Sequence, residues 1–310
     1  MTMISIITAV HNQIEFNRLF LKYLERHTHH PYELIVVDNH STDGSTELFA
    51  QHGAQIVRNE ENHCYPESQN MGMERAGGEY LAFLNNDIVL APDWDRHVCD
   101  AMRIHGLEVA SLGSWESVED PYRRRAFNQR WKWLRKGRRY LRHDAASAER
   151  MMDALYKDGG FFAWAEEERR RWYPRVHMGI CGSAVVTTRR MWEKLDGWWD
   201  VEMEAADFDL FARVTRRAVE RGDIRPPFIV PWALHHHFSR VTFRADPEPR
   251  ACRHRHRRVE EKWSPQEQAL YGPQLLEEWG WYVEFRRFIK RFRIGRRVVR
   301  EDVATKGGAP

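Results

Sequence analysis

The fold of this 310-residue chain is indicated most clearly by residues 33–45, which read ELIVVDNHSTDGS. Residues 34–37 form a continuous aliphatic run, which is typical of a strand buried on both faces of a sheet. The chain then passes through Asp38 and Asn39 into a polar segment in which Asp43 stands where a helix N-cap belongs. A buried strand that leads through polar residues into a helix predicts one βα unit of a parallel sheet.

The same unit repeats on both sides of this stretch. Apolar runs predict strands at residues 4–10, 54–57, 80–84 and 109–112, and amphipathic segments predict helices at 16–26, 42–52, 67–76 and 94–104. The alternation stops near residue 119 and returns with a strand at 182–187, helices at 189–195 and 208–221, and short strands at 228–230 and 234–238. We therefore predict an α/β fold with a mainly parallel sheet that is flanked by helices and joined by right-handed crossovers.

The composition is that of a globular protein, with 42% hydrophobic and 30% charged residues, and a net charge of +3 favours no class of partner. Wide spacing of the four cysteines disfavours a zinc site or a disulfide scaffold and suits a reducing cytosol; they are Cys64, Cys99, Cys181 and Cys252. Residues 1–5 lead directly into an apolar strand, so no signal peptide is expected, and no stretch reaches the ~18 apolar residues of a membrane span. We expect a cytoplasmic protein.

Polar residues follow three of the predicted strands at their carboxyl ends, where open α/β sheets bind ligands. His11 follows the first strand, Asp38 and Asn39 follow the second, and the segment Asn85-Asn86-Asp87 follows the fourth. One aspartate could accept a hydrogen bond from a nucleobase or a ribose, and another could hold a divalent cation beside a diphosphate. The alternative is that these residues only form turns and caps, as Asp and Asn often do.

Two segments carry a resemblance to a known family. Residues 33–45 resemble the nucleotide-binding segment of family 2 glycosyltransferases of the GT-A fold. Residues 70–72 and 76–87 resemble that family's next block, which ends in the DxD-type metal-binding motif. The resemblance is dense over residues 3–95 and looser over 178–240. It implies a GT-A fold and an inverting transferase of the kind that builds bacterial surface glycans.

The resemblance also implies roles for individual residues. Ala9 and His11 would contact the base of the donor, Asp38 would bind uracil or a related base, and Asp87 would ligate Mg²⁺ or Mn²⁺ under the donor diphosphate. The complete expected donor-binding set is Ala9, His11, Asp38, Asn39, Asn70, Asn85, Asn86 and Arg240. The motif here has a single carboxylate, so metal binding should be weak until the donor diphosphate supplies further negative ligands.

The second half of the chain supplies a candidate base. Residues 195–200 and 204–210, LDGWWD and EAADFDL, resemble the family's "GGFDE … EDxDL" block, in which Asp207 matches the catalytic base. The preceding acid of the family's pair is Ala206 here, and the nearby Glu204 could partly substitute for it. The alternative is that Asp207 and Asp209 only stabilise the start of the following helix. The residues expected on the acceptor side are Gly182, Ser183, Trp198 and Trp199.

Three consecutive histidines, residues 235–237, lie in a predicted strand. His235 and His237 would share one face of that strand, and the family often places a histidine near the metal or the diphosphate, so both are candidate metal ligands. A three-histidine zinc site is disfavoured because no carboxylate or cysteine stands at ligand spacing. Arg240 is a candidate clamp for the diphosphate.

Basic residues are concentrated in the middle and at the end of the chain. Residues 123–142 contain ten Arg or Lys and no acid, interleaved with aromatic residues. This run could be a solvated helix face, a surface for an anionic acceptor or a lipid diphosphate at a membrane, or, less favoured, a nucleic-acid surface. A basic amphipathic pattern at 281–299 either lies on a membrane or packs on the catalytic domain.

These observations divide the chain into four parts. Residues 1–118 form the donor-binding half, 119–177 a helical basic insertion, 178–245 the acceptor and catalytic half of the same GT-A domain, and 246–310 a basic helical extension. The predicted function is metal-assisted transfer from a nucleotide-sugar, with a UDP-sugar expected, to a glycan or lipid-linked acceptor, at the inner face of a membrane. The alternatives are a nucleotidyltransferase of similar fold and a non-catalytic nucleotide- or nucleic-acid-binding module. The loop after the first strand lacks the glycine-rich phosphate loop that a nucleotidyltransferase needs.

Overall fold

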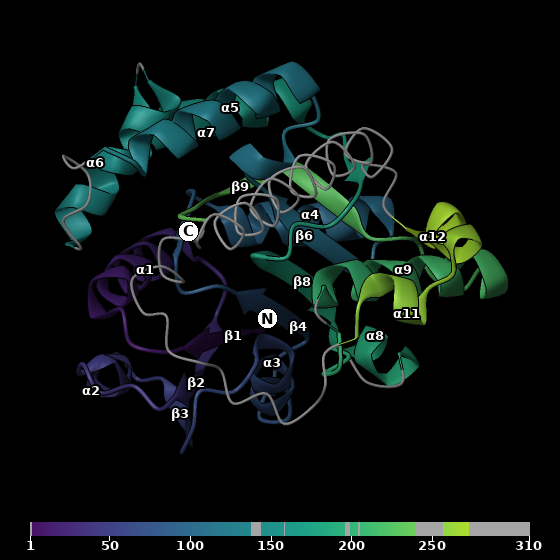
Figure 1. Ribbon diagram of the computed structural model, residues 1–310, viewed down its shortest axis with the longest axis horizontal. Coiled ribbons are helices and arrows are strands. Elements are labelled where there is room, and N and C mark those ends of the chain that lie inside the picture. The colour runs from purple at the N-terminus through teal and green to yellow at the C-terminus, as the bar shows by residue number, and fades with distance from the viewer. Residues whose placement is uncertain are drawn as a thin grey trace, which may run out of the picture.

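A nine-stranded sheet forms the centre of the computed structural model, which describes residues 2–137, 144–157, 159–195, 199–203, 205–239 and 257–272 (Figure 1). The strand order is β3-β2-β1-β4-β8-β6-β9-β5, and β7 pairs with β9 outside this path. The strands are β1 (Ile4–Val10), β2 (Tyr32–Asn39), β3 (Gln55–Asn59), β4 (Tyr80–Leu84), β5 (Ile88–Leu90), β6 (Val109–Gly113), β7 (His177–Met178), β8 (Ala184–Thr188) and β9 (Phe228–His237).

The sheet is mostly parallel, as the sequence predicts. Strands β3, β2, β1 and β4 pair in parallel, β8 lies antiparallel between β4 and β6, and β6 pairs in parallel with β9. Strands β1, β2, β3, β4, β6 and β9 therefore point in one direction, and β8, β5 and β7 oppose them. Their carboxyl ends consequently lie along one edge of the sheet, where a ligand site is expected.

Helices cover both faces of the sheet because successive side chains of each strand point to opposite faces. Ile6 of β1 packs into a core with α1, α2 and α4, whereas the next residue, Ile7, packs into a core with α3, α8 and α9. The helices are α1 (Ile14–His27), α2 (Ser45–Gln51), α3 (Tyr65–Met73), α4 (Trp94–His105), α5 (Pro121–Leu134), α6 (Ala145–Tyr156), α7 (Gly160–Trp172), α8 (Arg189–Lys194), α9 (Ala206–Arg221), α11 (Val259–Lys262) and α12 (Pro265–Tyr271), with a short 3₁₀ turn η1 (Trp115–Ser117).

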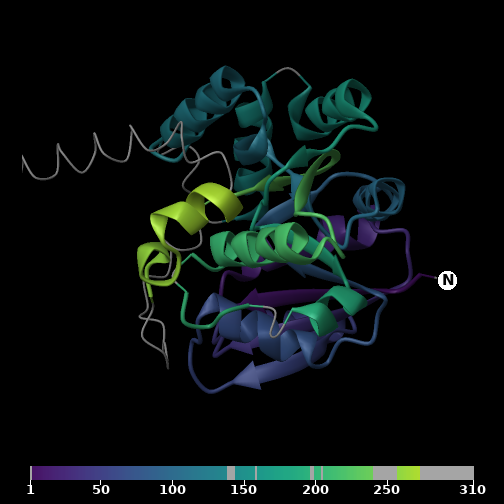
Figure 2. The ribbon, with the colours of Figure 1, turned by 90° about the vertical axis from the view of Figure 1, so that its right-hand side faces the viewer.

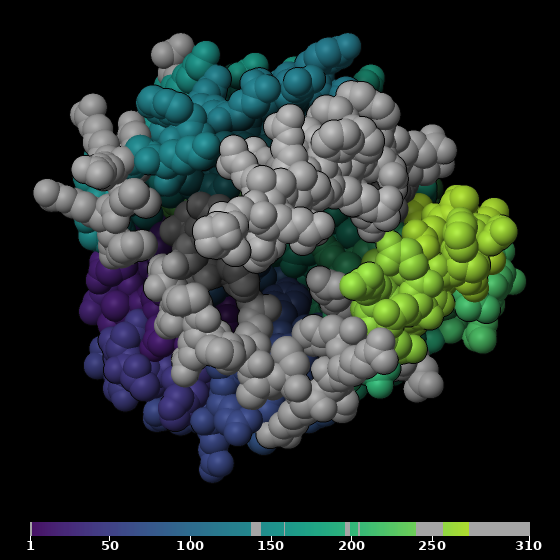
Figure 3. All heavy atoms as spheres, in the orientation of Figure 1, coloured from purple at the N-terminus to yellow at the C-terminus, as the bar shows by residue number. Residues whose placement is uncertain are grey.

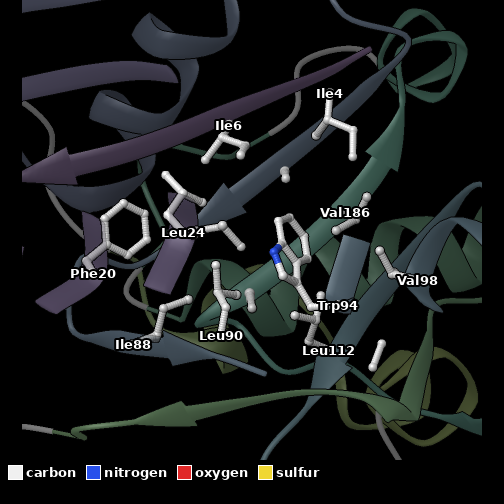
Figure 4. Close-up of a cluster of buried hydrophobic side chains, with 14 of the residues drawn as sticks. Ile4, Ile6, Phe20, Leu24, Ile88, Leu90, Trp94, Val98, Leu112 and Val186 are labelled. Carbon is white, nitrogen blue, oxygen red and sulfur yellow. The ribbon is translucent and has the colours of Figure 1, made fainter. Parts of the chain in front are cut away.

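Trp94, at the start of α4, fills the middle of the first core. Figure 4 shows its ring among Leu90, Leu112 and Val186, which come from three different strands, and Trp94 is completely buried. Its indole Nε1 donates to Thr28 Oγ1 at 3.0 Å, so the one polar atom of the ring is also satisfied. The core thus fixes α4 and the end of α1 against the strands that carry the candidate site.

The insertion folds as the three helices α5, α6 and α7, in agreement with its predicted helical character. Figures 1 and 2 show these helices together on one side of the molecule, away from α2 and β3. Their shared core is built mainly from aromatic and methionine side chains, with Leu134 and Leu155 among them. It reaches α1 through Tyr23 and β9 through Leu234 and the following Phe238. The core of the insertion is therefore continuous with the packing around α1 and β9.

Three features of the strands differ from the sequence prediction. Strands β5 and β7 are too short, at three and two residues, to give a periodic signal. The two strands predicted at 228–230 and 234–238 form one strand, β9, whose register with β6 shifts between Leu112 and Gly113. Pro231 lies at this irregularity, and it interrupts the apolar run because proline lacks the N–H that a ladder needs.

Candidate active site

Two loops meet where β4 ends and β8 begins. The N–H of Asn85, directly after β4, donates to the carbonyl of Ser183 at 3.0 Å. On the other side, a β-carbon added to Gly182 would lie 2.8 Å from Asp207 Oδ2. The structure therefore connects the motif at 85–87 with the candidate base through the loop of Gly182 and Ser183.

Asp87 lies beside His237. Asp87 Oδ1 lies 3.4 Å from His237 Nε2. The other ring nitrogen of His237, Nδ1, donates to Glu116 Oε2 at 2.6 Å. The pairing of β5 with β9, which places Ile88 opposite His237, sets this arrangement. Burial alone would lower the pKa of His237, but the two adjacent carboxylates raise it well above its usual value.

The residues around Asp87 suit a divalent cation that also binds a diphosphate. Asn85 Oδ1 is buried and has no hydrogen-bond partner within the described part of the chain, so it is an oxygen available to a ligand. Asp87 would add a carboxylate and His237 an imidazole whose second nitrogen is oriented by Glu116, a common arrangement at metal sites. Among the described residues no group of three or more His, Cys, Asp or Glu forms a complete metal cage.

The three histidines have different surroundings. His235 is completely buried, and its Nε2 lies 2.8 Å from Ser183 Oγ. Burial lowers the pKa of His235 to about 3, so the ring is neutral near pH 7. His236 points to the opposite face, where its Nδ1 lies 3.0 Å from the hydroxyl of Tyr156 in the insertion. His235 thus holds the loop of Ser183, and His237 is the histidine beside Asp87.

Asp207 lies in the first turn of α9, as the sequence predicts. Its side chain is exposed to solvent, and Oδ1 accepts from the N–H of Phe208 at 2.9 Å. Protein atoms nevertheless crowd the carboxylate, and this desolvation raises its pKa above the ordinary value of 3.8. A solvent-accessible carboxylate with a raised pKa can take a proton from a hydroxyl.

Asp209, two residues further on, has a structural role instead. It is completely buried and accepts from Arg213 Nε at 2.8 Å and from Trp263 Nε1 at 2.9 Å. Lys262 Nζ lies 2.7 Å from Asp209 Oδ1, the oxygen that also accepts from Trp263. These contacts hold α11 against α9.

Three expected site residues, Glu204, Trp198 and Arg240, lie outside the described residues, as does the segment 281–299.

Asp38 is buried at the end of β2, with 1% of its surface exposed. Its Oδ1 accepts from the N–H of Ser41 at 3.0 Å, and its Oδ2 accepts from Thr46 Oγ1 at 2.5 Å. The carboxylate therefore shapes the loop between β2 and α2. Each oxygen retains a further lone pair, because a carboxylate can accept about four hydrogen bonds in all.

The remaining donor-side residues mostly build the frame of the site. Asn39 is buried and bonds Ser68 and Asn59, whereas Ala9 and His11 are partly exposed at the end of β1. His11 Nδ1 donates to the carbonyl of Asn39 at 2.6 Å, which fixes the orientation of the ring.

Asn70 and Asn86 also make defined contacts. Asn70 bonds both the N–H and the carbonyl of Trp199, at 3.1 and 2.9 Å. Trp199 itself is 2% exposed and packs edge-on against Tyr65 and Phe83, so the structure places it in the core behind the site. Asn86 Nδ2 donates to Asn17 Oδ1 on α1 at 2.7 Å.

Two residues of the site were not identified from the sequence. Glu116 follows β6 at the same edge of the sheet as Asp38 and Asp87. Its place shortly after a predicted strand could have identified it as a candidate. Tyr65, at the start of α3, donates to the carbonyl of Gly182 at 3.3 Å. Burial raises the pKa of Tyr65, and the negative charges of Asp207 and Asp87 raise it further. No sequence signal identifies Tyr65.

Comparisons with known proteins give a consistent result. The chain is 30% identical over 95 residues to the putative glycosyltransferase EpsH of Bacillus subtilis, and this match covers 29% of the chain and 28% of EpsH. It is 31% identical over 90 residues to the putative teichuronic acid biosynthesis glycosyltransferase TuaG of the same organism, covering 27% of the chain and 36% of TuaG. The chain thus matches about a third of the length of these curated relatives.

Solved structures match more of the chain at lower identity. A mannosyltransferase from Pyrobaculum calidifontis, PcManGT, is 14% identical, with 76% of this chain and 56% of that one covered and a TM-score of 0.47. Residues 1–349 of S. aureus TarS are 10% identical, with 77% and 61% covered and a TM-score of 0.48.

The family model described as glycosyl transferase family 2 matches residues 5–162. The match includes β1 to β6, the loop of Asp38 and the motif that ends in Asp87. Since it spans half of the chain, the chain belongs to glycosyl transferase family 2.

Proposed function

We propose that the chain transfers a sugar from a nucleotide-sugar donor, a UDP-sugar in the first instance, to a hydroxyl group of a glycan or lipid-linked acceptor. Transfer is a single displacement with inversion. The new bond joins the acceptor oxygen to the anomeric carbon while the bond from that carbon to the diphosphate breaks, and the nucleoside diphosphate leaves. Family membership supports the transfer, and the site residues support the mechanism.

One observation carries this proposal. The loop of Gly182 and Ser183 contacts Asp207 on one side and Asn85 on the other, and the Tyr65 hydroxyl bonds the same loop. A base for the acceptor is thereby held near the motif that faces the leaving group. A displacement that inverts the anomeric carbon needs these two functions on opposite sides of one small space.

Asp207 is the proposed base, and the group around Asp87 binds the donor diphosphate. Asp207 Oδ2 takes the proton of the acceptor hydroxyl as the new bond forms. Asp87, His237 and Asn85 would hold Mn²⁺ or Mg²⁺, which supplies positive charge to the departing diphosphate. Asp38 and Asp43 set the shape of the loop that meets the base and ribose, since Asp43 also accepts from the N–H of Ile14 at the start of α1.

A surface polysaccharide is the proposed class of acceptor. Its support is the partial similarity to TuaG, whose name assigns it to teichuronic acid biosynthesis. No helix of the described residues is long and apolar enough to cross a membrane.

The test compares the protein with its Asp207→Asn variant. Nucleotide-sugars with different bases and sugars are incubated with Mn²⁺ or Mg²⁺, and release of nucleoside diphosphate is followed with and without candidate acceptors. We expect Asp207→Asn to lower transfer by roughly 10²–10⁴-fold and to leave the affinity for the nucleoside diphosphate unchanged. Retained transfer would exclude Asp207 as the base. Nucleotide binding without hydrolysis or transfer of any donor would favour a non-catalytic module.

A further inference from the structure

Helix α5 has two faces of different character. The inner face is formed by buried residues, Arg124, Trp131 and Leu134, and by Phe127, which packs against Tyr156 and Trp164. Trp131 Nε1 also donates to the carbonyl of Ser239 at 3.3 Å. This face joins α5 to the core of the insertion, so the orientation of the helix on the molecule is fixed.

The other face of α5 is exposed along its whole length. Tyr122 and Trp133 have 83% and 68% of their surface exposed. The exposed residues recur at spacings of three and four, which places those within α5 on one side of the helix, and Lys136 continues the series two residues beyond its end: Tyr122, Arg125, Ala126, Gln129, Lys132, Trp133 and Lys136. We call these seven residues the outer face of α5. Figure 3 shows the teal atoms of the insertion along the upper edge of the molecule.

The cations of this segment divide into two groups. Arg123 pairs with Glu168, with a shortest distance of 2.5 Å, and Arg124 donates to the carbonyl of Val118 at 3.1 Å. Arg130 donates to the carbonyl of Leu155 at 2.5 Å, and Arg135 to that of Ser239 at 3.3 Å. These four arginines stabilise the insertion internally.

The three cations of the outer face have no such role. Arg125, Lys132 and Lys136 form no ion pair with any residue that the structure describes, and residues 121–137 contain no acid. The nearest acid in sequence, Asp120, is occupied in capping the helix through the N–H groups of Tyr122 and Arg123. The outer face therefore presents positive charge and two large amphipathic rings to solvent.

We infer that the outer face of α5 docks on an anionic phospholipid surface. Tyrosine and tryptophan prefer the boundary between headgroups and acyl chains, and lysine and arginine pair with lipid phosphates at the same depth. Exposed aromatic rings on the same side of α5 as unpaired cations match that boundary. A duplex nucleic acid would use the cations but would leave Tyr122 and Trp133 without a partner.

This docking does not require the proposed transfer reaction. Binding to vesicles is measured without donor or acceptor, so its failure and the failure of the proposed function give separate results. If both hold, the surface would place the enzyme beside a lipid-linked acceptor.

The test is sedimentation of the full chain with vesicles of phosphatidylcholine alone or mixed with phosphatidylglycerol. The variant Arg125→Gln/Lys132→Gln/Lys136→Gln removes three charges from the outer face. The matched control Arg103→Gln/Arg190→Gln/Arg216→Gln removes three exposed charges from α4, α8 and α9. A third variant, Tyr122→Ala/Trp133→Ala, removes the rings. Melting curves check that each variant is folded.

We expect the chain to bind the anionic vesicles. The first variant should lose at least tenfold in partitioning, because each basic residue near such a surface contributes about fivefold. The control should change by less than half as much, and the ring variant should bind both vesicle types more weakly. The inference is overturned if the chain binds no vesicle, if the control loses as much as the outer-face variant, or if a single-stranded oligonucleotide binds through these cations while vesicles do not.

Discussion

Gly182 offers the most direct test of the candidate site, because the absence of a side chain there leaves room for Asp207. An alanine β-carbon at this position would lie 2.8 Å from Asp207 Oδ2 and 3.0 Å from Asp207 Cβ. The φ angle of Gly182 is not in the left-handed region, so alanine brings no backbone strain of its own. The substitution Gly182→Ala therefore acts on its neighbour.

The size of the effect follows from these two distances. The carboxylate of Asp207 could rotate away, but its β-carbon is fixed to α9 and cannot. Carbon atoms in good contact are ~3.5–4.0 Å apart, so the start of α9 must move by about 0.5–1 Å. Displacements of this order at a reacting group cost up to ~10²-fold in rate, and overpacking costs about 1–3 kcal/mol of stability. We expect Gly182→Ala to lower kcat by about 10–100-fold.

The assay measures kcat, the affinity for the nucleoside diphosphate and the melting temperature. Gly77→Ala is the matched control, because its β-carbon would meet the end of the flexible Glu33 side chain at 3.3 Å, far along the sheet from the site. In the Asp207→Asn background the alanine should cost little further activity, since the base that it displaces is already absent.

Two results would refute the reasoning. Wild-type turnover in Gly182→Ala, with an unchanged melting temperature, would mean that this loop does not contact the base in solution. A loss of nucleotide affinity equal to the loss of kcat would place the effect on the donor side. Additive losses in the double variant would show that Gly182 acts through another group.

Three further predictions follow from the site. Desolvation by the surrounding protein atoms raises the pKa of the Asp207 carboxylate, so kcat/KM should rise with pH through a value above 3.8. Because the charged form is disfavoured in the folded protein, Asp207→Asn should also raise the melting temperature near pH 7 and lose this advantage as the pH falls toward 3.8. Glu116→Gln should raise the Mn²⁺ concentration needed for half-maximal transfer by roughly 10–100-fold, whereas the exposed Glu119→Gln should not. Asp209→Ala should lower stability in urea unfolding by about 1–3 kcal/mol, because the buried indole N–H of Trp263 loses its acceptor and Arg213 and Lys262 lose one of their contacts; an unchanged unfolding midpoint would contradict the structural role of Asp209.

The fold was predictable because its strands are continuous apolar runs. β1 begins and ends at the predicted residues, and β4 does so as well, since burial on both faces keeps charged residues out of both strands. The N-cap of α2 was predicted one residue too early: Gly44 rather than Asp43 occupies it, although Asp43 Oδ1 still accepts from the N–H of Ser45, the first residue of the helix, at 3.0 Å. Local chemistry decided all of these features.

The contacts between residues of the site were harder to predict from the sequence. Glu116 and His237 are 121 residues apart, and Tyr65 and Gly182 are 117 apart. Their meeting depends on β8 entering the sheet between β4 and β6 and on β9 entering it between β6 and β5, and no local pattern encodes that order. The same holds for Asp38, whose match to the family motif gave no sign that Ser41 and Thr46 occupy its carboxylate.

The unusual motif Asn85-Asn86-Asp87 is consistent with an active site rather than a decayed one. Asn17 Nδ2 donates to the carbonyl of Asn12 and to Ser45 Oγ, so Asn17 Oδ1 must face Asn86 as an acceptor. An aspartate at 86 would place two acceptors together, whereas the amide satisfies both groups. Only positions 85 and 87 are then left for a ligand. Asn85 Oδ1 has no hydrogen-bond partner among the described residues. Asn85 carries no negative charge, but Glu116 supplies one nearby, through its contact with the histidine beside Asp87.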